Sequence, residues 1–186
     1  GEDRYAHYRG GEEEFWLRFS RRTVEHATGD EIDAELAHKA LEMLREAFRQ
    51  PAAWQVYPDV FPALDALKAD GVRLGVVSNW DSRLPGILDM LGLAGYFDTV
   101  GVSHLEGVEK PDPALFSRVL ERMNGDPRHA LHVGDIPELD GAGARAAGID
   151  DVLVDRAGRL DASYGALPDL ETLPEIARNG RTGGSG

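Results

Sequence analysis

A small set of polar residues has the types and positions needed to bind and transfer a phosphoryl group. Ser78 and Asn79 directly follow a valine-rich run, and Lys110 lies a few residues beyond a second run. Asp135 and Asp140 follow a third. A hydroxyl can hold phosphoryl oxygens, a lysine ammonium is a compact positive charge, and carboxylates are oxygen ligands for Mg²⁺. Such a site also needs a nucleophile, which this set of residues does not contain.

The elements that must position these residues alternate regularly between helix and strand after Pro51. Helical patterns and short β-branched runs follow one another, and Asp112 with Pro113 has the composition of a helix start. This rhythm predicts right-handed crossovers and an α/β fold, a doubly wound parallel sheet with helices on its faces. Ligands of such sheets bind beyond the carboxyl ends of the strands, where the polar residues above would meet. The expected helices are 59–69, one that carries Leu84, Ile87, Leu88 and Leu91, one from Pro113, and 138–147. The expected strands are 72–77, 99–102, 130–133 and 152–154.

Residues 11–50 carry helical patterns without a strand, which predicts a helical hairpin that could serve as a small cap. Asp30 is the expected N-cap of the second helix, and the acidic run 12–14 is expected to be a charged helix start. Phe15, Trp16 and Phe19 are expected in the cap core. We expect a helical cap at residues 1–53, an α/β core at 54–178 and a flexible, glycine-rich tail at 179–186. The sequence has no initiator methionine, which is typical of a partial reading frame.

Composition excludes several classes of partner. The formal net charge is −13 with a pI near 4.8, so a nucleic-acid backbone or an anionic membrane surface would repel the chain. With no cysteine, disulfides and thiolate zinc sites are excluded. No apolar run approaches the roughly 18 residues of a spanning helix, and no signal peptide is evident, so we expect a cytoplasmic protein.

Each site residue also has a structural interpretation. Ser78 could be a turn or capping residue, and Lys110 could be a solvated surface lysine. Asp135 and Asp140 could simply favour the positive end of the following helix. His132 lies inside a strand pattern, which favours a core histidine with its hydrogen bonds satisfied over a metal ligand.

The ordered motifs resemble the haloacid dehalogenase superfamily, whose signature is an Asp-x-Asp strand, then Ser or Thr, then Lys, then an acidic pair. The segments 76–79, 109–113 and 132–135 with Asp140 match the last three in the right order. Between Trp54 and Phe116 the chain looks most like the third group of haloacid dehalogenase-like hydrolase domain proteins. The resemblance covers roughly residues 11–178.

The resemblance implies roles for the site residues. Ser78 and Lys110 would be catalytic, with Ser78, Asn79 and Lys110 binding the phosphoryl group of a small phosphorylated metabolite. Asp135 and Asp140 would hold Mg²⁺ or the lysine. The family reaction passes through an aspartyl-phosphate that water hydrolyses.

The sequence departs from the family pattern at the nucleophile. No apolar run ending in Asp-x-Asp occurs, and the nearest imitation, at Asp155, has Ala157 in place of the second aspartate. By resemblance, the absent first strand belongs at the centre of the sheet, between 72–77 and 130–133. We therefore expect unpaired sheet edges that could drive association with other chains.

The leading hypothesis is a magnesium-dependent phosphate-ester hydrolase in the complete protein, with this chain alone inactive for lack of the nucleophile. One alternative is a non-catalytic pseudoenzyme or fragment that retains metal or phosphate binding. Another is a hydrolase of the 2-haloacid dehalogenase type. An upstream strand ending in Asp-x-Asp would favour an enzyme over a non-catalytic module.

Overall fold

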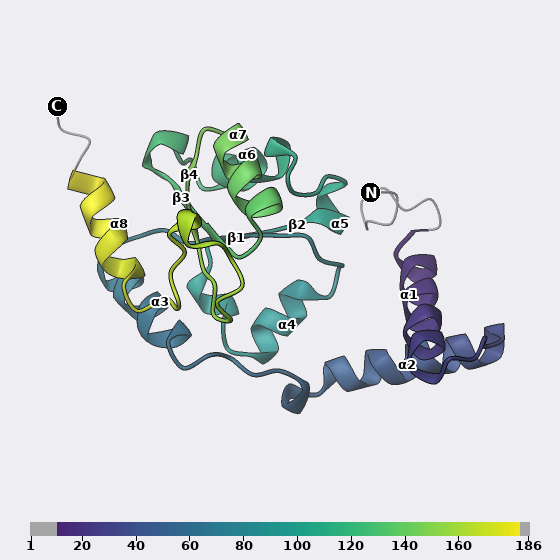
Figure 1. The fold of residues 1–186 in the computed structure, drawn as a ribbon. Coiled ribbons are helices and arrows are strands. Elements are labelled where there is room, and N and C mark those ends of the chain that lie inside the picture. The colour runs from purple at the N-terminus through teal and green to yellow at the C-terminus, as the bar shows by residue number, and fades with distance from the viewer. Residues whose placement is uncertain (1–10, 183–186) are drawn as a thin grey trace.

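The computed structural model describes residues 11–182, in which a helical hairpin is followed by alternating helices and short parallel strands (Figure 1). This order confirms the predicted α/β class. The elements are α1 (Gly11–Thr28), α2 (Ala34–Arg49), α3 (Val60–Ala69), β1 (Gly75–Ser78), α4 (Leu84–Met90), β2 (Thr99–Val102), α5 (Ser103–Glu106), α6 (Pro113–Arg122), β3 (Leu131–Gly134), α7 (Ala142–Ala146), β4 (Asp150–Leu153) and α8 (Leu173–Thr182).

The strands form two parallel pairs. β1 pairs with β2, with Ser78 opposite Val102, and β3 pairs with β4, with Gly134 opposite Leu153. Within residues 11–182, the ladders place β1–β2 and β3–β4 in separate two-stranded sheets. The carboxyl ends of β1 and β3 carry the predicted site residues. The predicted central strand would lie between these two strands and stays a prediction.

Helices cover the strands on both sides, with α6 and α7 on one side and α3 and α4 on the other (Figure 1). The start of α6 confirms the predicted cap, because the Asp112 side chain accepts from the Ala114 amide at 2.9 Å and Pro113 occupies the first turn. Phe116 of α6 is 1% exposed and packs with Ala144 of α7 and with Val77 of β1. This apolar cluster lies directly behind the site and joins the two strand pairs through helix packing.

Several predicted element boundaries shift for local reasons. The run 72–77 becomes a strand only from Gly75, because the backbone of Leu74 pairs with Asp98, partly through the Asp98 side chain at 2.9 Å. The predicted helix 138–147 is divided into a π-helix, Pro137–Gly141, and α7. The π turn accommodates Asp140, whose amide donates to the Ile136 carbonyl at 2.7 Å.

The hairpin of α1 and α2 corrects two predictions. Asp33, and not Asp30, caps α2, because its side chain accepts from the Leu36 amide at 2.8 Å and the helix begins only at Ala34. Trp16 is buried as predicted, but Phe19 is 46% exposed and lies outside the packed core. Residues 1–10 of the predicted cap lie outside the described residues.

The carboxyl end also differs from expectation. α8 continues to Thr182, so residues 179–182 of the expected tail are helical, and 183–186 lie outside the described residues. Arg178 of α8 pairs with Asp70 at 2.8 Å, which fixes the helix beside α3.

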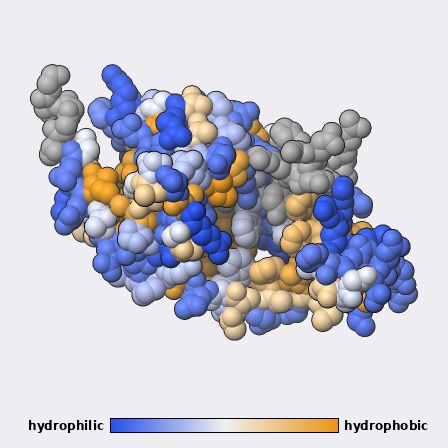
Figure 2. All heavy atoms as spheres, in the orientation of Figure 1, coloured by the Kyte–Doolittle hydropathy of each residue, from blue (hydrophilic) through white to orange (hydrophobic). Residues whose placement is uncertain are grey.

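No helix in residues 11–182 is long and apolar enough to cross a membrane. Figure 2 shows hydrophilic residues over the outer end of the hairpin, with hydrophobic residues exposed over the body and where the hairpin meets it.

Candidate active site

The structure brings Asn79, Lys110 and Asp140 together at the carboxyl ends of β1 and β3. Asn79 follows β1, Lys110 lies in the loop before α6, and Asp140 lies in the π-helix after β3. The Lys110 ammonium is 2.6 Å from the Asp140 carboxylate. The predicted convergence of the second, third and fourth motifs is therefore present for these residues. In the structure, Asp140 is the partner of the lysine.

Asn79 holds the backbone of Lys110. Its side-chain oxygen accepts from the Lys110 amide at 2.7 Å, and its side-chain nitrogen donates to the Lys110 carbonyl at 3.0 Å. The two residues are distant in sequence, so this contact ties the end of β1 to the loop before α6. Both the oxygen and the nitrogen of the Asn79 side chain are therefore hydrogen-bonded within the protein.

Asp140 is a buried carboxylate with every oxygen engaged. It is 1% exposed. One oxygen accepts from Lys110 and lies 3.0 Å from Nε2 of His132, while the other accepts from the backbone amides of Asp135 at 3.1 Å and Ile136 at 2.9 Å. A buried charge is tolerated only when it is paired and hydrogen-bonded in this way.

The electrostatics of Asp140 follow from these partners. Burial by itself would raise the pKa of Asp140, but hydrogen bonds from His132 and Lys110, together with the lysine charge, outweigh it. The pKa of Asp140 therefore lies far below its usual range. The carboxylate stays ionised at neutral pH and provides a fixed negative charge for the lysine.

Gly134 provides the space for Asp140. A Cβ atom added at Gly134 would lie 2.2 Å from Cγ of Asp140 and 2.7 Å from its Oδ1. No side chain can occupy that position while the carboxylate remains where it is. Steric exclusion of a side chain therefore explains the glycine at position 134, whether or not a metal binds nearby.

His132 is the residue that sequence reasoning excluded from the site. Its Nε2 is 3.0 Å from Asp140, and its ring packs edge-on against Phe116 at 4.9 Å between centroids. It is a hydrogen-bonded core histidine as expected, yet it also helps to hold the charge at the centre of the site. The alternation of side chains along a strand could have indicated this, because His132 and Gly134 share one face of β3.

Ser78 and Asp135 border the same network. Ser78 is the last residue of β1 and is partly buried, next to Asn79. Asp135 follows β3 and is exposed, whereas Asp140 is enclosed. Because the Asp140 oxygens already accept four hydrogen bonds, Asp135 is the better carboxylate to ligate an added cation. Across the described residues, His, Asp and Glu side chains do not gather in threes around a possible metal position.

The hairpin contacts the core close to this site. Glu12 of α1 lies 3.1 Å from Nε2 of His104, and it also accepts from the Ser82 hydroxyl at 3.3 Å. The guanidinium of Arg83 stacks 4.8 Å above the Trp16 ring. The sequence indicates only a charged helix start at Glu12, because the partners of its side chain lie 70 or more residues away.

Asp155, which lies in the segment most similar to the family's nucleophile motif, stabilises a turn. Its side chain accepts from the backbone amides of Ala157 at 3.2 Å and Leu160 at 2.6 Å. These bonds lower its pKa and fix the loop after β4. This use of the carboxylate supports the expectation that Asp155 is not the nucleophile.

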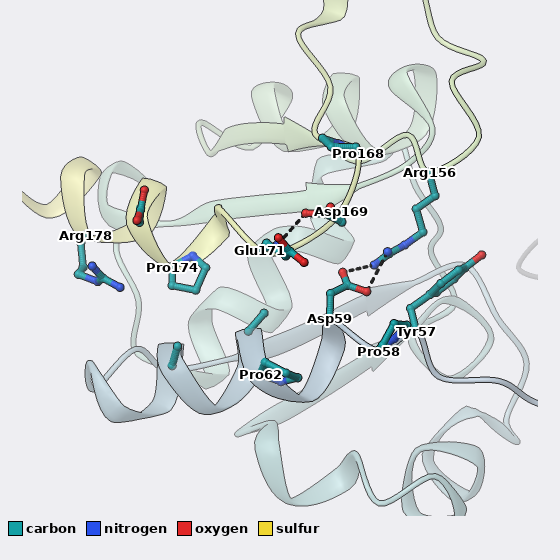
Figure 3. Close-up of a pocket in the computed structure, with 13 residues that line it drawn as sticks. Tyr57, Pro58, Asp59, Pro62, Arg156, Pro168, Asp169, Glu171, Pro174 and Arg178 are labelled. Atoms are coloured by element: carbon teal, nitrogen blue, oxygen red, sulfur yellow. Dashed lines mark hydrogen bonds and ion pairs between the residues drawn. The ribbon is translucent and has the colours of Figure 1, made fainter.

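A hollow of about 720 Å³ lies between α3 and α8 and does not include the site residues (Figure 3). Charged side chains of its lining form ion pairs with each other. Arg156 makes a two-pronged ion pair with Asp59, and the guanidinium lies 4.0 Å from the Tyr57 ring centroid. The remaining acids of its lining, Asp169, Glu171 and Glu175, disfavour a phosphorylated ligand there.

The comparisons with known proteins agree with the geometry at the strand ends. A family model for haloacid dehalogenase-like hydrolases matches residues 1–148. The chain belongs to the haloacid dehalogenase-like hydrolase family. The resemblance seen in the ordered motifs is thereby confirmed.

Individual relatives place the chain among the hydrolases of this family. Haloacid dehalogenase-like hydrolase domain-containing protein 3 of Homo sapiens is 36% identical over 165 residues, which cover 88% of this chain and 65% of that protein. A phosphoserine phosphatase of Thermus thermophilus is 32% identical over 163 residues, covering 84% of this chain and 60% of that protein. This chain thus spans less than two thirds of the length of these two relatives.

A solved structure extends the comparison to three dimensions. A HAD-hydrolase of Bacillus subtilis, solved bound to magnesium, matches with a TM-score of 0.70 at 25% identity. The match covers 89% of this chain and 72% of that one. The family fold is therefore shared over most of both chains.

Proposed function

We propose that this chain is the larger part of a phosphate-ester hydrolase that acts on a small phosphorylated metabolite. The observation that carries the proposal is the lysine held against a buried, ionised carboxylate at the carboxyl edge of the strands. A fixed ammonium at this edge can neutralise charge that develops on a transferring phosphoryl group. The similarity to a phosphoserine phosphatase of Thermus thermophilus supports the same chemistry.

The residues would divide the work as follows. Lys110 would bind and neutralise phosphoryl oxygens, and the Ser78 hydroxyl would donate a hydrogen bond to them. Asp140 would orient Lys110, and Asp135 would ligate Mg²⁺ together with water and phosphate oxygens. Bound magnesium would supply further charge neutralisation at the phosphoryl group. In this proposal Asp140 acts through the lysine.

The nucleophile would come from outside these 186 residues. We infer a strand ending in Asp-x-Asp that pairs with the free edges of β1 and β3 in the complete protein. Two observations support this: β1 and β3 belong to separate strand pairs in the described chain, and the curated relatives are longer. The chain alone would then lack turnover.

The test is turnover of an aryl phosphate by the protein extended upstream in its own reading frame. Replacing Lys110 with methionine should lower kcat/KM by roughly 100-fold, the usual effect of removing one group that stabilises transition-state charge. Lys68→Met, an exposed lysine of α3, is the matched control and should leave kcat/KM unchanged. Turnover by the 186-residue chain alone, abolished by Asp155→Asn, would overturn the proposal.

The same assay separates the alternatives. A non-catalytic protein would bind orthophosphate without turnover even when extended. A hydrolase of the 2-haloacid dehalogenase type would release halide from a 2-haloacid and leave aryl phosphates intact. Neither outcome is compatible with the proposed phosphatase.

A further inference from the structure

We propose that Asn79 is a positioning residue, whose side-chain amide fixes the backbone of Lys110 and thereby decides where the ammonium group lies. The inference rests on the proposed function of Lys110 at the phosphoryl group. It differs from the role in binding the phosphoryl group that the family resemblance implies for Asn79, which stays a prediction.

The geometry of the contact is that of a backbone pair. The Asn79 oxygen accepts from the Lys110 amide at 2.7 Å and the Asn79 nitrogen donates to the Lys110 carbonyl at 3.0 Å. A primary amide has the donor and the acceptor side by side, so it can satisfy both backbone groups of one residue. Aspartate lacks the donor, and alanine lacks both groups.

The fixed backbone matters because lysine has a long, flexible side chain. Its ammonium can remain 2.6 Å from Asp140 only if both ends of the contact are held. Asp140 is held by the amides of Asp135 and Ile136. Asn79 holds the other end, so a continuous chain of contacts runs from the end of β1 to the end of β3, strands that belong to separate pairs.

A simple turn role for Asn79 does not explain this arrangement. An asparagine that serves a turn bonds to backbone about two residues further along the chain. The partner of Asn79 lies 31 residues away and is the same residue that contacts Asp140. The contact therefore positions a functional side chain and does more than shape its own loop.

The experiment measures how fast each lysine is acetylated in the full 186-residue chain, by peptide mass spectrometry at limiting reagent. Lys39 and Lys68 are exposed and serve as internal references, whereas the Lys110 side chain is 13% exposed and ion-paired. Asn79→Ala should raise the Lys110 rate relative to the references by roughly fivefold, because two hydrogen bonds are lost. Asn79→Asp keeps the acceptor alone and should give an intermediate rate.

Two further variants make the outcomes distinct. Asn124→Ala perturbs a residue with a φ of 48° at the far end of α6, and it should leave the Lys110 rate unchanged even if the chain becomes less stable. Asp140→Asn removes the charge that holds the ammonium and should raise the rate by itself. If Asp140→Asn has no effect, the lysine–carboxylate pair of the proposed function is wrong.

A different result would overturn the positioning role alone. If Asp140→Asn raises the Lys110 rate while both Asn79 variants match the wild type, Asn79 does not position the lysine. Equal increases in Asn79→Ala and Asn124→Ala would also contradict it, because they would reflect general loss of stability. Urea unfolding of each variant shows whether it folds. If Asn79→Ala does not fold, the acetylation rate of Lys110 in Asn79→Asp decides the test.

Discussion

At the scale of single residues, the site depends on one buried charge and the space made for it. Asp140 receives hydrogen bonds from Lys110, His132 and two backbone amides, and Gly134 leaves room for its carboxylate. Removing one partner of such a charge leaves the other uncompensated, which costs far more than the pair contributes to stability. The residues around Asp140 should therefore be intolerant of change for structural reasons as well as for catalysis.

Replacing Gly134 with alanine should displace Asp140 and separate it from Lys110. The added Cβ would lie 2.2 Å from Cγ of Asp140, and relieving such overpacking typically costs about 1–3 kcal/mol in the free energy of unfolding. Urea unfolding measures the loss. Gly86→Ala is the matched control, since a Cβ at Gly86 in α4 would meet nothing within 4 Å. Equal stability of the two variants would contradict the steric role of Gly134.

The acid sensitivity of the fold should depend on Asp140. Its pKa in the folded protein lies below the ordinary 3.8, so the unfolded chain binds its proton first as the pH falls. The stabilising contribution of the carboxylate is thus complete above about pH 5 and is lost as the pH falls below 3.8 toward the folded pKa. Unfolding free energies from pH 6 to pH 3 should fall more steeply in the wild type than in Asp140→Asn. Parallel curves would contradict the assignment.

At the scale of elements, the hairpin is linked to the core by a few polar and aromatic contacts. Glu12 of α1 contacts Ser82 and His104, and Trp16 stacks on Arg83. The rings of Trp54 and Trp80 lie 6.2 Å apart where the chain passes from hairpin to core. Such a junction can open at low cost, because partly exposed ion pairs contribute little.

Replacing Glu12 with glutamine should loosen this junction. The partly exposed contact with His104 contributes at most about 1 kcal/mol, so the open population should rise by no more than about fivefold. Trp16, Trp54 and Trp80 all lie at or near the junction, so acrylamide quenching of tryptophan fluorescence should increase. Glu14→Gln, an exposed neighbour on the same helical turn, is the control and should leave quenching unchanged.

The elements show what the sequence could and could not predict. The strand at Thr99–Val102 and the capped start of α6 were predictable, because β-branched periodicity and the Asp112-Pro113 pair are local signals. The π turn around Asp140 was not predictable, because it depends on a side chain that satisfies amides and a distant lysine at the same time. The contacts of Asn79 and Glu12 were likewise not predictable, since each joins segments far apart in the sequence.

At the scale of the whole molecule, the strands form two separate pairs within residues 11–182. The packing of α6 against α7 and the contacts of Lys110 with Asn79 and Asp140 join the two pairs. The inner edges of β1 and β3 would present unpaired backbone groups, which recruit other strands. The net charge of −13 opposes association at low salt. Association should therefore grow as salt screens the charge.

Sedimentation velocity should detect this association. The chain should be increasingly oligomeric above physiological salt, and a peptide of about six apolar residues followed by Asp-x-Asp should reduce oligomers by occupying the edges. The same peptide with a central proline is the control, because proline removes a ladder hydrogen bond. If the chain stays monomeric at every salt concentration, with or without the peptide, the strand edges are not free.

The central claim is that phosphoryl oxygens bind at the ends of β1 and β3, between Ser78 and Lys110. Titration of the ¹⁵N-labelled chain with orthophosphate in the presence of Mg²⁺ tests it most directly. Amide shifts should be concentrated at Ser78, Lys110 and Asp135, and they should weaken in Lys110→Met. Shifts concentrated instead at Arg156 in the hollow between α3 and α8, or no saturable shifts at all, would contradict it.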